Sequence, residues 1–400
     1  MAPRTRTGQL VLVAVVMVLG MATWFSASAV APAVRADWGV SARDATWLTG
    51  AVQLGFVAGA LTSALLTLSD RIPLPRLIGV NAVVAAAATA GIAAFADSLA
   101  TALPFRFLTG FALAGVYPPG LKLMATWFDR GLGLALGVVV GALTLGGALP
   151  QLVVGSVHHG WRPVLYIAAG MAVLSGALAV VGLRPGPLAL TSAPFDPRKA
   201  LVLFENRSSR LATLGYLGHM WELYAMWTWL PTFVAASFAA RGGLPSWTPG
   251  AHTVAFVTIG VAGLAGCMLF GWWGDRVGRA RLAAIAMAMS ATCCLLASAL
   301  YGHHPAVLLP VLIVWGFAVI ADSGLFSSCI SQTVDPRYVG TALTTQLALG
   351  FLLTVVTIQA VPSLVDAGGW RLPIALLAIG PAIGTVAMLA LDRAPERLRT

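Results

Sequence analysis

The chain has 400 residues, of which 58% are hydrophobic and 10% are charged, and its formal net charge is +10. Soluble domains carry about 25% charged residues, so this composition excludes an ordinary water-soluble fold. The basic residues stand singly between apolar runs and form no basic block, which argues against a nucleic-acid partner.

Apolar segments fill the chain almost from end to end. Charges, prolines and glycines divide it into twelve spans, each about as long as the roughly 20 residues that a helix needs to cross a bilayer. The first apolar run is too long for a signal-peptide core, so we expect a retained first helix. The spans start near residues 9, 45, 77, 99, 131, 163, 211, 251, 282, 305, 340 and 371. We predict an all-α protein with twelve transmembrane helices in a lipid bilayer.

The first half carries a few polar side chains within its spans. Trp24 stands in a run of aromatic and hydroxyl residues at mid-depth of the first span, where it could line a cavity or simply pack. Arg106 and Lys122 both fall in the fourth span, 16 residues apart, which is about 24 Å along a regular helix. Charge in lipid is costly, so Arg106 should contact solute or a gate. Lys122 should lie nearer the cytoplasm, where it binds solute or snorkels to the interface.

Residues 184–210 interrupt the apolar pattern with several prolines and basic residues. We expect a central linker there, between an N-terminal unit (residues 1–183) and a C-terminal unit (residues 211–400). Most Lys and Arg residues fall in loops on the same side as this linker, and cytoplasmic loops are the ones that accumulate such residues. We therefore place the linker and both termini in the cytoplasm and the protein in the inner membrane.

The seventh span has an unusually polar and aromatic middle. His219 and Glu222 are three residues apart and so share a helical face, flanked by Tyr216 and Tyr224. Glu222 should lie near the midplane, as should Asp322 of the tenth span. A buried carboxylate can alternate between charged and neutral forms, so Glu222 and Asp322 are candidates for proton coupling. Fixed ion pairs are the alternative, and Asp322 could pair with Lys122 or Arg106.

Several local signals recur in the second half at nearly one offset, between 205 and 209 residues. Their positions predict a duplicated six-helix unit, hence two pseudo-symmetric six-helix bundles with a binding site between them. The matched segments are Asp70-Arg71 and Asp275-Arg276, Gly110-Phe111-Ala112 and Gly316-Phe317-Ala318, and Gly160-Trp161-Arg162 and Gly369-Trp370-Arg371.

The loop before the ninth span reads GWWGDRVGRAR over residues 271–281. Its glycines permit a tight turn, while Asp275 can accept hydrogen bonds from helix N-termini, Arg276 or Arg279. This segment resembles the loop signature of the major facilitator superfamily at every defining position. The resemblance implies that these three residues form a gating latch on the cytoplasmic side, and ordinary basic loop residues are the alternative.

The matching loop in the first half keeps Asp70 and Arg71, but prolines replace the rest of the pattern, so we expect a weaker latch there. The segment from Arg106 through Lys122 also resembles a signature of the superfamily. Together with the Trp127-Phe128 end of that span, it is similar to bacterial carriers of nitrate, cyanate and small organic anions. Paired arginines typical of nitrate carriers are missing from the second and eighth spans, which favours an organic anion.

The resemblance implies alternating access around a site at the midplane. We expect a monomeric, proton-coupled secondary transporter of a small polar or anionic solute. Its solute-binding residues would be Arg106, Lys122, Trp24, Tyr216, His219 and Tyr224. No catalytic, nucleotide-binding or metal-ligand pattern occurs, so we predict neither enzyme activity nor a cofactor. Proton-driven multidrug efflux suits the aromatic seventh span, although Ala142 stands where antiporters have proline. A non-transporting sensor is the other alternative.

Overall fold

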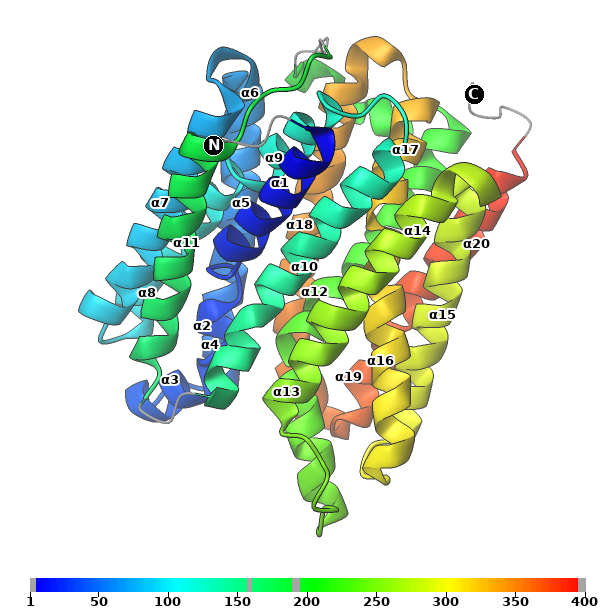
Figure 1. Ribbon diagram of the computed structural model, residues 1–400. Helices are drawn as coiled ribbons and strands as arrows, with labels where there is room; N and C mark the ends of the chain where they lie inside the picture. Colours follow the sequence, from blue (N-terminus) through cyan, green and yellow to red (C-terminus); the bar gives the residue numbers. More distant parts are fainter. Residues whose placement is uncertain (1–4, 157–159, 189–194, 395–400) are drawn as a thin grey trace.

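The computed structural model describes residues 5–156, 160–188 and 195–394, with the side chain of Asp275 left out. Figure 1 shows two groups of long helices side by side, one from each half of the chain. The start of the first helix, the end of the last and the segment between the halves lie at the same end of the molecule, which we call the linker end.

Six helical crossings form the N-terminal bundle, and several are divided by short irregular turns. Its helices are α1 (Arg6–Met21), α2 (Ser26–Ala29), α3 (Ala31–Trp38), α4 (Ala42–Ala45), α5 (Trp47–Leu65), α6 (Leu68–Arg71), α7 (Leu74–Phe95), α8 (Leu99–Leu113), α9 (Tyr117–Ala125), α10 (Leu132–Ser156) and α11 (Arg162–Gly182).

The C-terminal bundle repeats this plan, and the short linker helix η1 (Pro197–Phe204) precedes it. The helices of the bundle are α12 (Arg207–Arg241), α13 (Ala251–Ala255), η2 (Phe256–Ala262), α14 (Gly263–Val277), α15 (Arg279–Ala299), α16 (Pro305–Ala321), α17 (Ser323–Thr333), η3 (Pro336–Tyr338), α18 (Val339–Gly368), α19 (Arg371–Leu377) and α20 (Ile379–Asp392).

The predicted all-α membrane fold is confirmed. Within the described residues, 10 helices are long and apolar enough to cross a bilayer. The other two crossings are α1, whose 16 residues are short for a span, and α12, whose 35 residues include the polar middle noted in the sequence. The positions of these two helices agree with the predicted twelve crossings, although α1 is shorter and α12 more polar than a typical crossing.

A glycine contact explains the repeated Gly-Phe-Ala triplet. A Cβ atom at Gly110 would lie 2.0 Å from the backbone oxygen of Val52, and one at Gly316 would lie 1.9 Å from that of Thr258. Only glycine allows such an approach of two helix backbones. Val52 and Thr258 are themselves one repeat apart, so both bundles contain the same crossing, of α5 with α8 and of η2 with α16.

The repeated Gly-Trp-Arg triplet forms the turn that enters the last helix of each bundle. Gly160 and Gly369 have φ angles of 68° and 66°, in the left-handed region that favours glycine. The tryptophans that follow pack on other aromatic rings. The ring centroids of Trp161 and Trp38 are 5.4 Å apart, and those of Trp370 and Trp229 are 6.0 Å apart. The triplets thus mark equivalent corners of the two bundles.

The most extensive contacts between the bundles are those of α5 with α18 and of α10 with the crossing formed by α13, η2 and α14. Small residues bring the second pair close together. A Cβ atom at Gly137 would lie 2.5 Å from the backbone oxygen of Cys267, and one at Gly141 would lie 2.5 Å from the Leu264 side chain. The glycine-rich fifth crossing is therefore an inter-bundle surface.

Candidate central site between the bundles

The first crossing is broken at mid-depth, because α1 ends at Met21 and α2 begins at Ser26. Arg106 of α8 binds two backbone carbonyls at this break and one carbonyl of α5. Its Nε donates to the oxygen of Leu48 at 2.8 Å and its Nη1 to that of Thr23 at 3.0 Å, while Nη2 donates to that of Trp24. The side chain is fully buried. No carboxylate of the described residues pairs with it, so its positive charge is balanced only by carbonyl dipoles.

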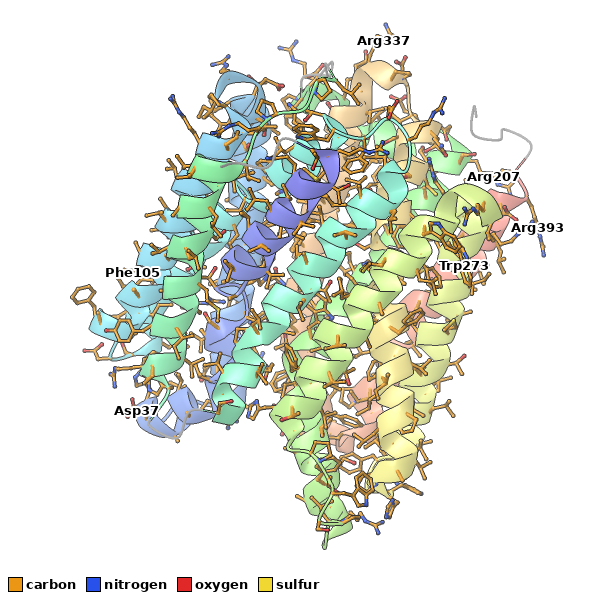
Figure 2. All side chains as sticks on the ribbon, in the orientation of Figure 1. Asp37, Phe105, Arg207, Trp273, Arg337 and Arg393 are labelled. Carbon is orange, nitrogen blue, oxygen red and sulfur yellow. The ribbon has the colours of Figure 1, made fainter. Side chains whose placement is uncertain are left out.

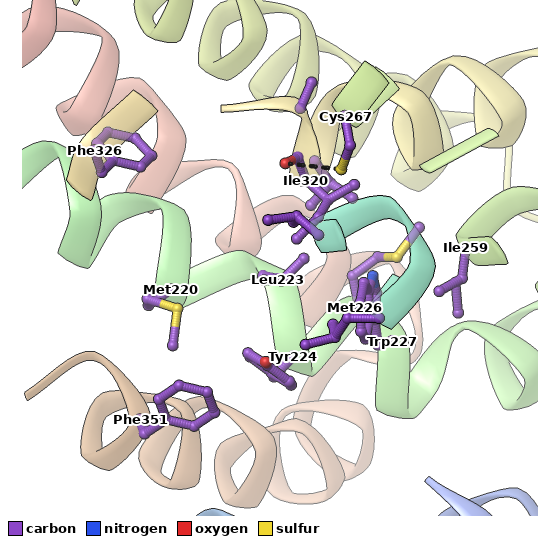
Figure 3. Packing of buried hydrophobic residues seen from close by; sticks show 14 of the residues in the cluster. Met220, Leu223, Tyr224, Met226, Trp227, Ile259, Cys267, Ile320, Phe326 and Phe351 are labelled. Carbon is purple, nitrogen blue, oxygen red and sulfur yellow. Dashed lines mark hydrogen bonds between the residues drawn. The ribbon is translucent and has the colours of Figure 1, made fainter. Parts of the chain in front are cut away.

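Aromatic rings from both bundles meet beside this break. The ring of Trp24 lies 4.7 Å from Phe56 and is stacked on Tyr224 at 5.9 Å. Phe351 of α18 lies 4.6 Å from Phe56 and 5.1 Å from Tyr224. Figure 3 shows Tyr224 and Phe351 facing each other from α12 and α18. We call these four residues the aromatic cluster.

A cavity of about 410 Å³ lies between the bundles toward the linker end. Its wall comes from α5, α6 and α9 on one side and from α12, α17 and α18 on the other, and Phe195 of the linker closes part of it. Its polar wall residues are Ser63, Thr67, Ser69, Asp70, Lys122, Tyr216, Ser327, Thr344 and Gln346. A smaller cavity of about 120 Å³ lies between the bundles on the other side and is lined by Ser28, Thr49 and Trp229, among others.

The aromatic cluster separates these two cavities. Along α5, Thr49 lines the smaller cavity and Ala60 the larger one, with Phe56 between them. Along α12, Tyr216 lines the larger cavity and Trp229 the smaller one, with Tyr224 between them. The space between the bundles is thus wider toward the linker end and closed at mid-depth by aromatic side chains.

Lys122 and Asp70 form an ion pair on the wall of the larger cavity, with Nζ and Oδ1 2.5 Å apart. Lys122 also donates to the backbone oxygen of Ser69. Both side chains are partly exposed, and Arg71 beside them is exposed. The structure therefore brings a residue expected to bind solute together with one expected to act in gating.

His219 and Asp322 form a buried pair inside the C-terminal bundle. Nδ1 of His219 lies 2.9 Å from Oδ1 of Asp322, an ion-pair distance, although the angles are not those of a hydrogen bond. The prediction that Asp322 pairs with Lys122 or Arg106 is wrong. Asp322 lies at the turn between α16 and α17 and contacts α12 of its own bundle, whereas both basic groups are bound within the other bundle.

Glu222 is also enclosed within the C-terminal bundle. Its Oε1 accepts hydrogen bonds from Ser290 Oγ at 2.6 Å, from Cys294 Sγ at 2.9 Å and from Trp315 Nε1. The side chain is 2% exposed and does not line the larger cavity. The three donors come from α15 and α16. The residue spacing along α12 could not predict these contacts.

The loop of the GWWGDRVGRAR segment lies at the linker end. Gly278 has a φ angle of 99°, which gives the tight turn expected between α14 and α15. The guanidinium of Arg276 lies 4.0 Å from the centre of the Trp272 ring. Arg279 lines a further inter-bundle cavity of about 440 Å³, beside the start of α10. The side chain of Asp275 lies outside the described residues, so the predicted latch is only partly visible.

The six residues expected to bind solute thus fall into three groups. Trp24 and Tyr224 meet in the aromatic cluster, and Lys122 and Tyr216 line the cavity above it. Arg106 and His219 are buried behind these surfaces, one in each bundle. The sequence analysis named Trp24 and Tyr224 but missed Phe56 and Phe351, which complete the aromatic cluster.

The chain is similar to a "Gallate transporter" of Pseudomonas putida, with 27% identity over 301 residues. The match covers 66% of this chain and 64% of that protein, so it spans less than two thirds of the relative's length. It is also 27% identical, over 185 residues, to the "MFS-type transporter pynF" of Aspergillus niger, covering 45% of this chain and 40% of that protein.

A crystal structure of a variant of the nucleoside transporter NupG has the same fold. It superposes with a TM-score of 0.72 over 96% of this chain and 100% of that one, at 16% sequence identity. The profile of the Major Facilitator Superfamily matches residues 12–358. Nearly the whole described chain therefore carries the family's pattern, on the architecture that the family's transporters share. The protein belongs to the Major Facilitator Superfamily and is a multi-pass membrane protein.

Proposed function

We propose that this protein is a transporter that carries a small organic anion by alternating access, together with protons. The observation that carries the proposal is the buried charge of Arg106, which no carboxylate of the described residues balances. Dipoles alone stabilise it, so it leaves a positive potential at the break of the first crossing, directly behind Trp24. An anion at the aromatic cluster would be attracted by that charge.

Lys122 extends this attraction into the larger cavity, where a solute from the linker side would arrive. Its ion pair with Asp70 is partly exposed, so an incoming anion can exchange with the carboxylate at small cost. The similarity to the gallate transporter of Pseudomonas putida supports this solute class, because gallate is an organic anion.

Proton coupling is assigned to the C-terminal bundle. The His219–Asp322 pair lies one turn of α12 beyond Tyr216, which lines the larger cavity, and Nε2 of His219 has no hydrogen-bond partner. Glu222 lies one turn farther along the same helix. A proton taken up by this group of residues would neutralise one of its two carboxylates while an anion occupies the positive side of the site, which makes the protein a symporter.

The proposed orientation places the linker end in the cytoplasm and the protein in the inner membrane. Basic residues support this orientation: Figure 2 shows Arg207, Arg337 and Arg393 at the linker end and Asp37 at the other. Asp70, Arg71, Asp275, Arg276 and Arg279 would then form the cytoplasmic gating loops, in which charge contacts break and re-form as the bundles rock.

The test uses the purified full chain in liposomes, with radiolabelled small organic anions outside and an imposed pH gradient. Uptake should be driven by an inwardly directed proton gradient and collapse with a protonophore. Asp322→Asn should lose uphill accumulation and keep anion exchange. If no organic anion is moved in either direction, the proposal fails. If Asp322→Asn still accumulates anion against its gradient, the coupling assignment alone is wrong.

The aromatic cluster also favours a second candidate, proton-driven efflux of flat hydrophobic compounds. Such compounds would stack on the same rings but gain nothing from the charge of Arg106. Cells that overproduce the transporter would then resist lipophilic cations, and these cations would compete with organic anions for the purified protein. Resistance without any anion binding would favour efflux over anion transport.

A further inference from the structure

Gln346 is a buried polar side chain with an unused hydrogen-bonding group. It is 2% exposed, and its Nε2 has no hydrogen-bond partner in the structure. It nevertheless lies on the wall of the larger cavity, on α18, opposite the α9 face that carries Lys122. Leaving a buried amide donor unpaired costs about 1–3 kcal/mol, so a ligand in the cavity that accepts a hydrogen bond from Gln346 would recover that free energy.

Tyr216 presents its aromatic ring to the same cavity, and the aromatic cluster lies farther toward mid-depth. Phe351 is five residues beyond Gln346 on α18, and a Cβ atom at Gly350 would lie 2.4 Å from the ring of Tyr216, so that ring packs directly on α18. Below lie Phe56, Tyr224 and Trp24, and Nε1 of Trp24 is another buried donor without a partner. Two unpaired N–H donors, one on the cavity wall and one in the aromatic cluster, therefore lie between the bundles together with several aromatic rings.

These contacts are easily exchanged. The rings of the aromatic cluster meet at centroid distances between 4.6 and 5.9 Å, in stacked or tilted pairs. A flat ring that enters from the cavity can replace one such pair by another of similar energy, about 0.5–1.5 kcal/mol beyond the buried area. A saturated ring of the same size lacks the matching faces and would have to push the aromatic side chains apart.

We infer that the transported anion is an aromatic carboxylate, whose ring lies on the aromatic cluster and whose oxygen atoms accept hydrogen bonds from Gln346. This inference rests on the proposed anion transport and narrows its solute. The cavity of about 410 Å³ is large enough for a single substituted ring. Lys122 and the buried Arg106 supply positive potential above and below the ring, and hydroxyl substituents would find the Nε1 donor of Trp24.

Binding to the purified full chain tests the solute class, since benzoic acid crosses bilayers unaided and would blur an uptake assay. The probes are benzoate, 4-hydroxybenzoate, cyclohexanecarboxylate and benzamide, each titrated by calorimetry and by thermal unfolding. The aromatic carboxylates should bind at least about tenfold more tightly than cyclohexanecarboxylate, which has the same charge and a similar size. Benzamide, which is neutral, should also bind at least about tenfold more weakly.

A matched pair of variants tests the residue. Gln346→Met keeps the side-chain volume and removes the amide, and Thr89→Val removes an unpartnered hydroxyl on α7 that is buried away from the cavity. Both variants should be at least as stable as the native protein, because each loses an unsatisfied polar group. Only Gln346→Met should weaken 4-hydroxybenzoate binding, by about 10- to 100-fold, the range for hydrogen bonds to charged groups.

Equal binding of benzoate and cyclohexanecarboxylate would overturn the aromatic solute while leaving anion transport intact. Tight binding of benzamide would overturn the role of the carboxylate. Native affinity in Gln346→Met, with raised stability, would overturn the role of the residue. Binding of none of the anions, together with no uptake of any small organic anion, would overturn this inference and the proposed function together.

Discussion

Replacing Arg106 separates its structural contribution from its electrostatic one. Arg106→Gln removes the charge and most of the donors, while Arg106→Lys keeps the charge and loses the planar group that reaches three carbonyls. In the native protein those carbonyls belong to Leu48, Thr23 and Trp24, on two crossings that the side chain ties to α8. The two variants should therefore share a loss of stability and differ in anion binding.

The magnitudes follow from the contacts. Each buried carbonyl that loses its donor costs about 1–3 kcal/mol, so losing two of the three destabilises the N-terminal bundle by about 2–6 kcal/mol. For binding, an anion about 8 Å from the guanidinium gains about 2 kcal/mol at an effective dielectric constant of about 20. That energy corresponds to about a 30-fold change in affinity, which Arg106→Gln should lose and Arg106→Lys should largely keep.

The assay is thermal unfolding of the purified variants in detergent, with and without increasing concentrations of the organic anion that binds the native protein. Stability without ligand should fall in both variants, while the half-saturating concentration should rise about 30-fold only in Arg106→Gln. Fluorescence-detected gel filtration shows whether each variant remains a folded monodisperse particle. An Arg106→Gln protein that binds the anion as tightly as the native one would refute the electrostatic reasoning.

The contacts also predict how three other substitutions change stability or anion binding. Gly316→Ala should lower thermal stability by about 1–3 kcal/mol or more because its Cβ would meet the backbone oxygen of Thr258, whereas Gly324→Ala, with no atom nearby, should not. Gln53→Met should raise the unfolding temperature, because both amide atoms of this buried side chain lack partners and the variant leaves none unpaired. Asp70→Asn should change stability by less than about 1 kcal/mol but tighten anion binding at low salt, measured by calorimetry, because Lys122 is no longer neutralised by that carboxylate.

The architecture could be predicted because membrane folds depend on features that a sequence states directly. Long apolar runs specify crossings, since lipid offers no partner for an unpaired backbone. The repeated triplets specified the duplication because each marks a steric requirement, such as the close helix contact at Gly110 and Gly316 or the left-handed turns at Gly160 and Gly369. Sterics of this kind leave little freedom in residue type.

The pairing of charges could not be predicted in the same way. Depth in the membrane follows from counting residues, and this placed Glu222 and Asp322 near mid-depth. Which neighbour each one meets depends on the rotation of every helix about its axis, which spacing within one helix does not determine. Asp322 therefore meets His219 of its own bundle, and Glu222 meets Ser290 and Trp315 from helices far along the chain.

The two bundles share a backbone plan but differ in their buried charges. In the proposed mechanism this difference determines which bundle attracts the anion and which takes up the proton. The N-terminal bundle holds the buried cation Arg106 at a broken crossing, while the equivalent crossing in the C-terminal bundle, α12, is unbroken and carries His219 and Glu222. A symmetric pair would bind solute and proton equally on both sides. Separation of charge lets an anion and a proton occupy opposite walls at once, so that their sum approaches neutrality when the bundles close. A closed state with little net charge leaves less uncompensated charge at the low-dielectric midplane, and is therefore more stable, than a closed state that carries either ion alone.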